Sequence, residues 1–214
     1  MGGGETPRAA QRFAEVVAAR LCHDISGPLS IIANAVELAR QEGGREGGEA
    51  IGLMAEGACE VAARVKLLRS LFGPPSGPLS AEEVGALVRG TIGSGRVEVD
   101  LSPLAPGTVF RPETGRVVLA SLVVAAEALP RGGTVRLHGG AEDFAVVIEG
   151  QNAAWPAHLT AVLGGAAPLD AAVAGGPRGL MGPYLALLAR EAGLVPSLLM
   201  GAGTPLLRLA GAAG

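Results

Sequence analysis

The stretch Ile51–Phe72, IGLMAEGACEVAARVKLLRSLF, decides the fold of the first third of the chain. Its apolar residues are spaced alternately three and four positions apart, as on a helix that packs lengthwise against other helices. These residues are Ile51, Met54, Ala58, Val61, Val65, Leu68 and Phe72. The spacing predicts one long helix that ends before the run Gly73–Pro78, and this glycine- and proline-rich run is expected to be an interdomain linker.

A second apolar stripe precedes this helix. Thr6 and Pro7 form a typical helix start, in which a hydroxyl cap is followed by a proline in the first turn. From there to about Gln41 apolar residues again recur every three or four positions, until the glycine-rich run 43–48 ends the pattern. The stripe consists of Phe13, Val17, Leu21, Ile25, Leu29, Ile32 and Val36. Residues 1–74 are therefore predicted to form a helical hairpin.

A single hairpin cannot bury both stripes completely, so it needs a further partner. Two hairpins from two chains would close a dimeric four-helix bundle, which is a stable solution for long amphipathic helices. Alternatively, the hairpin packs on the C-terminal part of its own chain. We favour the homodimer as the hypothesis.

Residues 79–214 are predicted to form a separate domain, which makes the fold class α+β. Helical and strand-like segments alternate irregularly there, and this order favours a mixed sheet covered by helices on one face. The expected strands are residues 96–101, 134–138, 144–149, 197–200 and 205–209. The expected helices are a short one after the capping box Ser80–Glu83, and residues 112–129, 156–163 and 182–192.

The composition excludes several classes of protein. The chain has 214 residues, of which 49% are hydrophobic, and a formal net charge of −3. It is therefore too apolar to be disordered, and it lacks the basic balance of a nucleic-acid-binding protein. The most apolar run, Val117–Ala126, is interrupted only by Ser121 and is too short to span a membrane. Cys22 and Cys59 have no metal-binding spacing and are expected to be reduced, buried thiols in a cytoplasmic protein.

The strongest candidate for chemistry is His23, in the segment RLCHDISGPL (residues 20–29). His23 lies about 200° around the helix from the apolar stripe, so it should face solvent. Asp24 is adjacent and can orient the imidazole. Pro28 stands inside a helix, an unfavourable placement that usually has a reason, and Gly27 leaves open space one turn after His23. An exposed, oriented imidazole with free space beside it can accept a group and pass it on.

These residues resemble a known motif. The pattern His-Asp-x-x-x-Pro-Leu, which starts at His23, is similar to the phospho-accepting motif of histidine-kinase dimerisation domains. The segment Leu122–Thr134, LVVAAEALPRGGT, resembles the stretch around the N-box of a kinase ATP-binding domain. In that register, however, the two asparagines of the kinase motif are replaced by Ala120 and Val124.

The second nucleotide-binding motif is degenerate as well. Glu149–Ala153, EGQNA, stands where the kinase pattern has Asp-x-Gly-x-Gly, although a glycine-bearing stretch remains at Gly175–Gly182. A phospho-accepting histidine beside a degenerate ATP site resembles the ChpT-type histidine phosphotransferases. This resemblance implies a dimeric four-helix bundle in residues 1–74, followed by a kinase ATPase-like α/β sandwich domain in residues 79–214.

The resemblance also implies a function. His23 would accept a phosphoryl group from the aspartate of one response-regulator receiver domain and pass it to the aspartate of another, without ATP. Asp24 would favour the reactive tautomer, and Arg20 and Gly27 would lie next to the phosphoryl group. The expected docking surface for receivers comprises Ser26, Ser30, Ile31 and Asn34.

The expected partners are therefore receiver domains and a second copy of the chain, with no nucleic acid or membrane. The protein would need no cofactor of its own, since Mg²⁺ would come with the receiver. Two alternatives stay open: an ATP-dependent sensor-kinase core with an unusual nucleotide site, and a non-catalytic adaptor that only docks receivers. His138 and His158 belong to no recognisable motif and are interpreted as structural.

Overall fold

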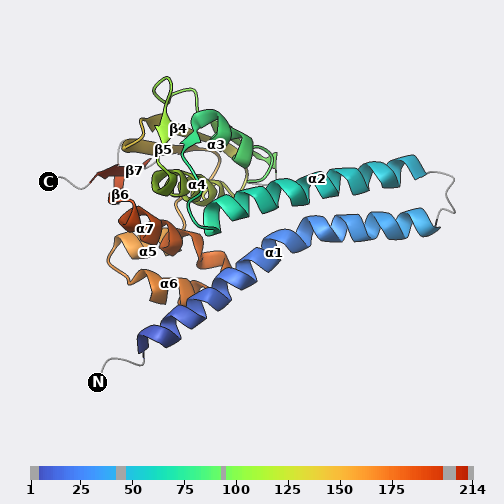
Figure 1. Cartoon of the computed structure of the whole chain (residues 1–214), viewed down its shortest axis with the longest axis horizontal. Coiled ribbons are helices and arrows are strands. Elements are labelled where there is room, and N and C mark those ends of the chain that lie inside the picture. The colour runs from blue at the N-terminus through green and yellow to red at the C-terminus, as the bar shows by residue number, and fades with distance from the viewer. Residues whose placement is uncertain (1–4, 42–46, 93–94, 200–205, 212–214) are drawn as a thin grey trace.

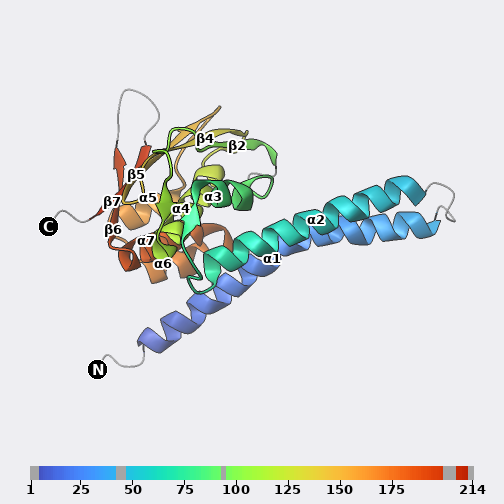
Figure 2. The ribbon, with the colours of Figure 1, turned by 45° about the horizontal axis from the view of Figure 1, so that its top comes forward.

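The computed structural model describes residues 5–41, 47–92, 95–199 and 206–211. Two long helices, α1 (Glu5–Gln41) and α2 (Gly47–Phe72), lie side by side and project from a mixed α/β domain (Figures 1 and 2). The predicted helical hairpin is confirmed. The first half of α1 continues past the end of α2 and runs along the domain beside α6 (Pro168–Gly175).

The two helices approach each other closely where their residues are small. Pro28 and Ala35 of α1 and Ala50 and Gly57 of α2 are buried. A Cβ atom at Gly57 would lie only 2.7 Å from Cγ1 of Ile32, so only glycine fits at this crossing without a shift. α1 changes direction about midway in both views, and the proline inside it, Pro28, accounts for a kink.

The single chain covers the predicted stripe on α1 only in part, as expected for one hairpin alone. Leu29, expected on the buried face, is 55% exposed, whereas the neighbouring Pro28 is buried. The two helices approach each other most closely at Gly57 of α2, which faces Pro28 and Ile32 of α1. Pro28 therefore lies in the contact between the helices, and the next residue, Leu29, points away from it. Cys22 and Cys59 are exposed, so the prediction that both thiols are buried is wrong. Both cysteines lie on helix faces that a single chain leaves open.

The base of the hairpin packs on the chain's own C-terminal domain. The ring of Tyr184 stacks on Phe72 of α2 at 4.9 Å between centroids and tilts against Phe13 of α1 at 6.3 Å. Leu67 and Leu71 of α2 belong to the same buried cluster as the core of the domain. The base of the hairpin therefore packs on the C-terminal part of its own chain, which was the alternative to the dimer. The distal half of the hairpin projects beyond the domain (Figure 1).

The C-terminal domain is built on a five-stranded mixed sheet with the order β2-β4-β5-β7-β6. The strands are β2 (Val97–Asp100), β4 (Gly133–Gly139), β5 (Asp143–Glu149), β6 (Leu194–Leu199) and β7 (Leu206–Gly211). β2 and β4 are parallel, and the other pairs are antiparallel. A separate antiparallel pair is formed by β1 (Leu79–Ser80) and β3 (Val109–Phe110). The predicted mixed sheet is confirmed.

Helices cover one face of this sheet. They are α4 (Pro112–Glu127), α5 (Ala157–Leu163), α7 (Met181–Glu191) and the short η2 (Pro177–Gly179), with α3 (Ala81–Val88) beside them. β5 alternates buried Phe144, Val146 and Ile148 with more exposed residues, as expected for a sheet with one core face. α4 is the central helix of the core, and most of its residues are buried. The sequence patterns did not indicate α6, β1 or β3.

Within the described residues, one helix segment, Arg8–Arg40 in α1, is long and apolar enough to cross a membrane by length and composition alone. Core helices of soluble proteins meet the same criterion. Arg20 and Asp24 lie within this segment and are paired with each other, and Arg20 is also paired with the C-terminal domain.

Candidate functional site

His23 lies on the exposed surface of α1, as predicted, with 65% of its side chain accessible. Its Nδ1 atom is 3.2 Å from Oδ1 of Asp24. A carboxylate only accepts hydrogen bonds, so this contact requires the proton of the neutral ring to be on Nδ1. Nε2 then carries the free lone pair and is the nucleophilic nitrogen.

The helix surface next to His23 is small and polar. A Cβ atom at Gly27 would have no neighbour within 4 Å, so this position is open. The hydroxyls of Ser26 and Ser30 donate to carbonyl oxygens of their own helix, at 2.6 Å and 2.8 Å. Ile31 is 44% exposed, and Asn34 is exposed as well. The residues expected to receive a partner thus lie on an accessible face of α1.

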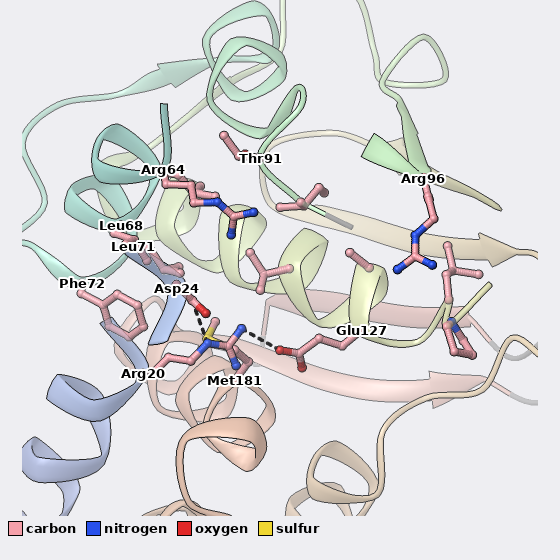
Figure 3. A pocket seen from close by; sticks show the side chains of 16 residues that line it. Arg20, Asp24, Arg64, Leu68, Leu71, Phe72, Thr91, Arg96, Glu127 and Met181 are labelled. Atoms are coloured by element: carbon pink, nitrogen blue, oxygen red, sulfur yellow. Dashed lines mark hydrogen bonds and ion pairs between the residues drawn. The ribbon is translucent and has the colours of Figure 1, made fainter. Parts of the chain in front are cut away.

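Arg20, one turn before His23, is the most highly connected side chain of the site. Its Nε donates to Asp24 Oδ2 at 2.8 Å, its Nη1 donates to the Pro177 carbonyl at 3.1 Å, and its Nη2 pairs with Glu127 Oε1 at 2.9 Å. Figure 3 shows the guanidinium between the two carboxylates. Burial disfavours the charge of Arg20, but the charges of Glu127 and Asp24 and their hydrogen bonds outweigh it. The pKa of Arg20 is therefore raised above its ordinary value.

The C-terminal domain supplies the other wall of the site. A cavity of about 380 Å³ lies between α1 and the domain. His23, Arg20 and Asp24 line it from the side of α1, and Glu127, His158, Arg178, Pro156 and Pro177 line it from the domain. Nε2 of His158, a residue interpreted as structural from the sequence, lies 3.4 Å from Glu127 Oε2. Neither of these two buried atoms has a hydrogen bond of good geometry in the described part of the chain.

Sequence reasoning did not connect these domain residues with His23. One signal was available: Glu127 is the only charged residue in the run 117–129, which is otherwise apolar or small. A single carboxylate in a buried helix usually has a cationic partner, but the pattern cannot say which one. Pro177 is also beyond sequence reasoning, because it contributes a backbone carbonyl.

A second cavity, of about 300 Å³, is also lined by Arg20, Asp24 and Glu127 (Figure 3). Its wall combines apolar side chains with the guanidinium groups of Arg20, Arg64 and Arg96. Arg64 is already paired with Glu60 of its own helix at 2.8 Å. The cavity marks the junction of α1, α2 and α4, next to Arg20 and Asp24.

The positions that would bind a nucleotide in a kinase are part of the core. Ala120 and Val124 have no accessible surface. The glycine-bearing stretch 175–182 joins α6, η2 and the start of α7, and it places the Pro177 carbonyl against Arg20. A Cβ atom at Gly182 would lie 2.6 Å from His158 Cδ2, so this glycine allows α5 and α7 to pack closely. Within the described residues, no group of three or more His, Cys, Asp or Glu could hold a metal ion.

Fold and site together define a protein with an accessible histidine on a helical hairpin, set beside an α/β domain in which Ala120 and Val124 are buried in the core. The family model of the histidine phosphotransferase C-terminal domain matches residues 81–199. This match covers more than half of the chain, which therefore belongs to the histidine phosphotransferase family and to the phosphotransferase class of enzymes.

Two known proteins are similar along most of their length. The protein phosphotransferase ChpT of Brucella abortus (strain 2308) is 28% identical over 184 residues, which cover 84% of this chain and 86% of ChpT. A solved structure described as a bacterial phosphotransferase at 1.7 Å has a TM-score of 0.75 and 25% identity to this chain. That likeness covers 94% of this chain and 96% of the solved one.

Proposed function

We propose that this protein relays a phosphoryl group between aspartates of response-regulator receiver domains through His23, without using ATP. The observation that carries the proposal is the geometry of His23. Its ring is accessible, and the contact between Nδ1 and Asp24 Oδ1 at 3.2 Å leaves Nε2 as the nucleophile. Membership of the histidine phosphotransferase family supports this chemistry.

The relay consists of two balanced steps. The Nε2 lone pair of neutral His23 attacks the phosphorus of an aspartyl phosphate on the first receiver. The N–P bond forms while the O–P bond to the carboxyl group breaks, and the receiver leaves with a free carboxylate. The phosphorylated ring, which keeps its proton on Nδ1, gains a positive charge that Asp24 stabilises. In the second step an aspartate carboxylate of another receiver attacks the phosphorus, and the N–P bond breaks to regenerate neutral His23.

Receivers dock on α1 beyond His23, over Ser26, Ser30, Ile31 and Asn34. The accessible apolar side chain of Ile31 gives this otherwise polar face an anchor. Gly27 leaves room for the phosphoryl group, and Arg20 lines the same cavity as His23. Because most of this chemistry is positioning, the protein needs no cofactor, and the Mg²⁺ belongs to the receiver.

The active form is a homodimer through a four-helix bundle. Leu29 is 55% exposed in the single chain and Ile51 is 62% exposed, and Leu53 is also exposed. Large apolar side chains gathered on one projecting element indicate a protein–protein interface. A second hairpin supplies a surface of the same kind. A dimer interface explains why α1 is rich in apolar residues, so no membrane is needed to cover them. The protein acts in the cytoplasm.

The two alternative functions have less support. A kinase needs polar side chains for the nucleotide and its Mg²⁺, whereas Ala120 and Val124 are apolar and fully buried. An adaptor that only docks receivers has no need of a histidine whose ring is fixed by a carboxylate. The protein is therefore expected to have neither autokinase activity nor a bound nucleotide.

The test is phosphoryl transfer from a receiver labelled on its aspartate with ³²P. The wild-type chain should acquire a label that is stable in alkali and lost in acid, which distinguishes phosphohistidine from an acyl phosphate. His23→Ala should acquire none, while the matched control His138→Ala, at an exposed position on β4, should behave as wild type. An equal label on His23→Ala would contradict the proposal. Tight binding of Mg-ATP with labelling from ATP would instead support the kinase.

A further inference from the structure

We propose that Glu127 is a positioning residue for phosphotransfer at His23: it holds Arg20, which holds Asp24, which orients the imidazole. This inference rests on the proposed function. It assigns a role to a carboxylate of the C-terminal domain that lies on α4, the helix on which Ala120 and Val124 stand where the similar kinase motif has asparagines.

The contacts form an unbroken series from α4 to His23. Glu127 Oε1 is 2.9 Å from Arg20 Nη2, Arg20 Nε is 2.8 Å from Asp24 Oδ2, and Asp24 Oδ1 is 3.2 Å from His23 Nδ1. The third guanidinium nitrogen, Nη1, donates to the Pro177 carbonyl at 3.1 Å. Since all three nitrogens of the planar guanidinium are bound, Arg20 has one defined orientation. Because Arg20 binds Oδ2 of Asp24, the oxygen that faces His23 is Oδ1.

Charge gives Glu127 a specific task. If Arg20 had Asp24 as its sole anionic partner, it would neutralise the carboxylate that stabilises the phosphorylated ring. Glu127 shares the guanidinium charge, so Asp24 retains negative charge for the imidazolium that forms on phosphorylation. The side chains of Arg20 and Glu127 are only 14% and 24% exposed, and such interactions are weakly screened where water is largely excluded.

The packing around Glu127 fixes its position. Its second oxygen, Oε2, faces His158 Nε2 at 3.4 Å. His158 is held in place by the close contact of α5 with α7 at Gly182. Arg178, on the same wall of the cavity, is the other charged group of the domain that faces His23. Glu127 is therefore the carboxylate of the domain through which α4 can act on Arg20.

The first experiment compares Glu127→Gln with wild type in transfer from a phosphorylated receiver. The substitution keeps the shape and an accepting oxygen but removes the charge. Transfer at saturating receiver should slow about tenfold, while the receiver binds within about twofold of wild type, because positioning affects the chemical step and not docking. The matched control is Glu149→Gln. Glu149 is paired with Arg136 on the open face of the sheet, and this control should transfer at the wild-type rate.

Two further measurements separate positioning from mere structural support. In the Arg20→Lys background, which lacks the fork that joins the two carboxylates, adding Glu127→Gln should have little further effect on the rate. The ¹⁵N spectrum of the imidazoles reports the tautomer directly, and the chain has three histidines, of which His23 is identified by its loss in His23→Ala. Neutral His23 should carry its proton on Nδ1 in wild type and as a mixture of tautomers in Glu127→Gln. Thermal melting of each variant monitors folding.

The outcomes distinguish this inference from the proposed function. If wild type and His23→Ala are labelled alike, the relay itself is wrong. If wild type is labelled on His23 but Glu127→Gln transfers equally fast, the relay stands and the role of Glu127 is wrong. A slow Glu127→Gln with an unchanged His23 tautomer, or with a full additional loss in the Arg20→Lys background, also overturns the role.

Discussion

The hydroxyl of Tyr184 on α7 donates a hydrogen bond of 2.9 Å to the carbonyl oxygen of Leu71 in the last turn of α2. Arg116 of α4 donates to the same carbonyl at 3.3 Å and to the Tyr184 hydroxyl at 2.7 Å. The end of the hairpin is thus bound to two helices of the C-terminal domain. A chain that phosphorylated itself would have to bring a nucleotide to His23, whereas a relay only has to present His23 to partners. A hairpin that is bound firmly to its own domain can meet the needs of a relay, because His23 only has to stay accessible to partners.

This junction predicts a stability that falls at high pH. Burial raises the pKa of Tyr184, and Arg116 lowers it only in part, so the folded state favours the protonated phenol. Because the folded-state pKa is raised, the contribution of Tyr184 is fully present below the ordinary tyrosine value of about 10. It is lost as the pH rises through the higher folded-state value. Urea unfolding of the wild type should therefore show a loss of stability above about pH 10.

Tyr184→Phe should remove that part of the pH dependence. At neutral pH the variant should be less stable by about 1 kcal/mol, because the Leu71 carbonyl keeps its bond from Arg116 but loses that from the phenol. The measurement is urea unfolding at pH 7 and above pH 10. Identical alkaline curves for Tyr184→Phe and wild type would show that another group causes the loss.

The homodimer predicts that a charge on the distal hairpin separates the chains. Val61→Asp should break the dimer, because an unpaired carboxylate would be buried between the two hairpins of the four-helix bundle. Ile51→Asp is a cleaner test, since Ile51 is 62% exposed in the single chain and a charge there need not disturb its fold. Sedimentation at micromolar concentration should show a dimer for wild type and a monomer for both variants.

The control for this prediction is Leu199→Asp. Leu199 is also a large exposed apolar residue, but it lies on β6, away from the hairpin. This variant should remain a dimer. A monomeric wild type, or a monomeric Leu199→Asp, would rule out the hairpin as the dimer interface.

The sequence was sufficient where local pattern determines structure. The three-and-four spacing of α2 and the alternation of β5 identified both elements, because each periodicity places apolar residues on one face. β1 and β3 have two residues each, too few for any period to appear. α6 has the sequence PLDAAVAG, whose small residues and C-terminal glycines, Gly175 and Gly176, obscure the helical pattern.

Only the part of the site that lies on one helix could be predicted from the sequence. His23, Asp24 and Arg20 lie within one turn of a single helix, so their proximity follows from helix geometry alone. Glu127 and Pro177 reach Arg20 only because the domain folds back onto α1. Leu29 shows the same limit, since periodicity marks an apolar stripe but not which of its side chains the second helix of the same chain covers.

Two glycines inside the hairpin predict substitutions of opposite sign. Gly27→Ala should stabilise the chain by up to about 1 kcal/mol, because alanine is the better helix former and a Cβ there meets nothing within 4 Å. Gly57→Ala should destabilise it despite the same gain in propensity, because its Cβ would lie 2.7 Å from Ile32 Cγ1 at the buried helix crossing. Paired thermal melts give the comparison. Equal shifts in the two variants would mean that α1 and α2 do not pack closely at Gly57.

The open position of Gly27 also predicts that the protein is a poor phosphatase towards its receivers. Many kinases with a similar motif carry Thr, Asn or Gln four residues after the histidine, where the side chain holds a hydrolytic water. Gly27 has no side chain for this purpose, and the neighbouring Ser26 hydroxyl is bound to the Cys22 carbonyl at 2.6 Å. Label that leaves a phosphorylated receiver should therefore be recovered on His23 or on a second receiver, with little inorganic phosphate released.

Gly27→Asn, which has room for its amide, serves as the comparison and should release more phosphate than wild type. Rapid release by the wild type that persists in His23→Ala would show that hydrolysis proceeds without phosphohistidine and that Gly27 does not prevent it.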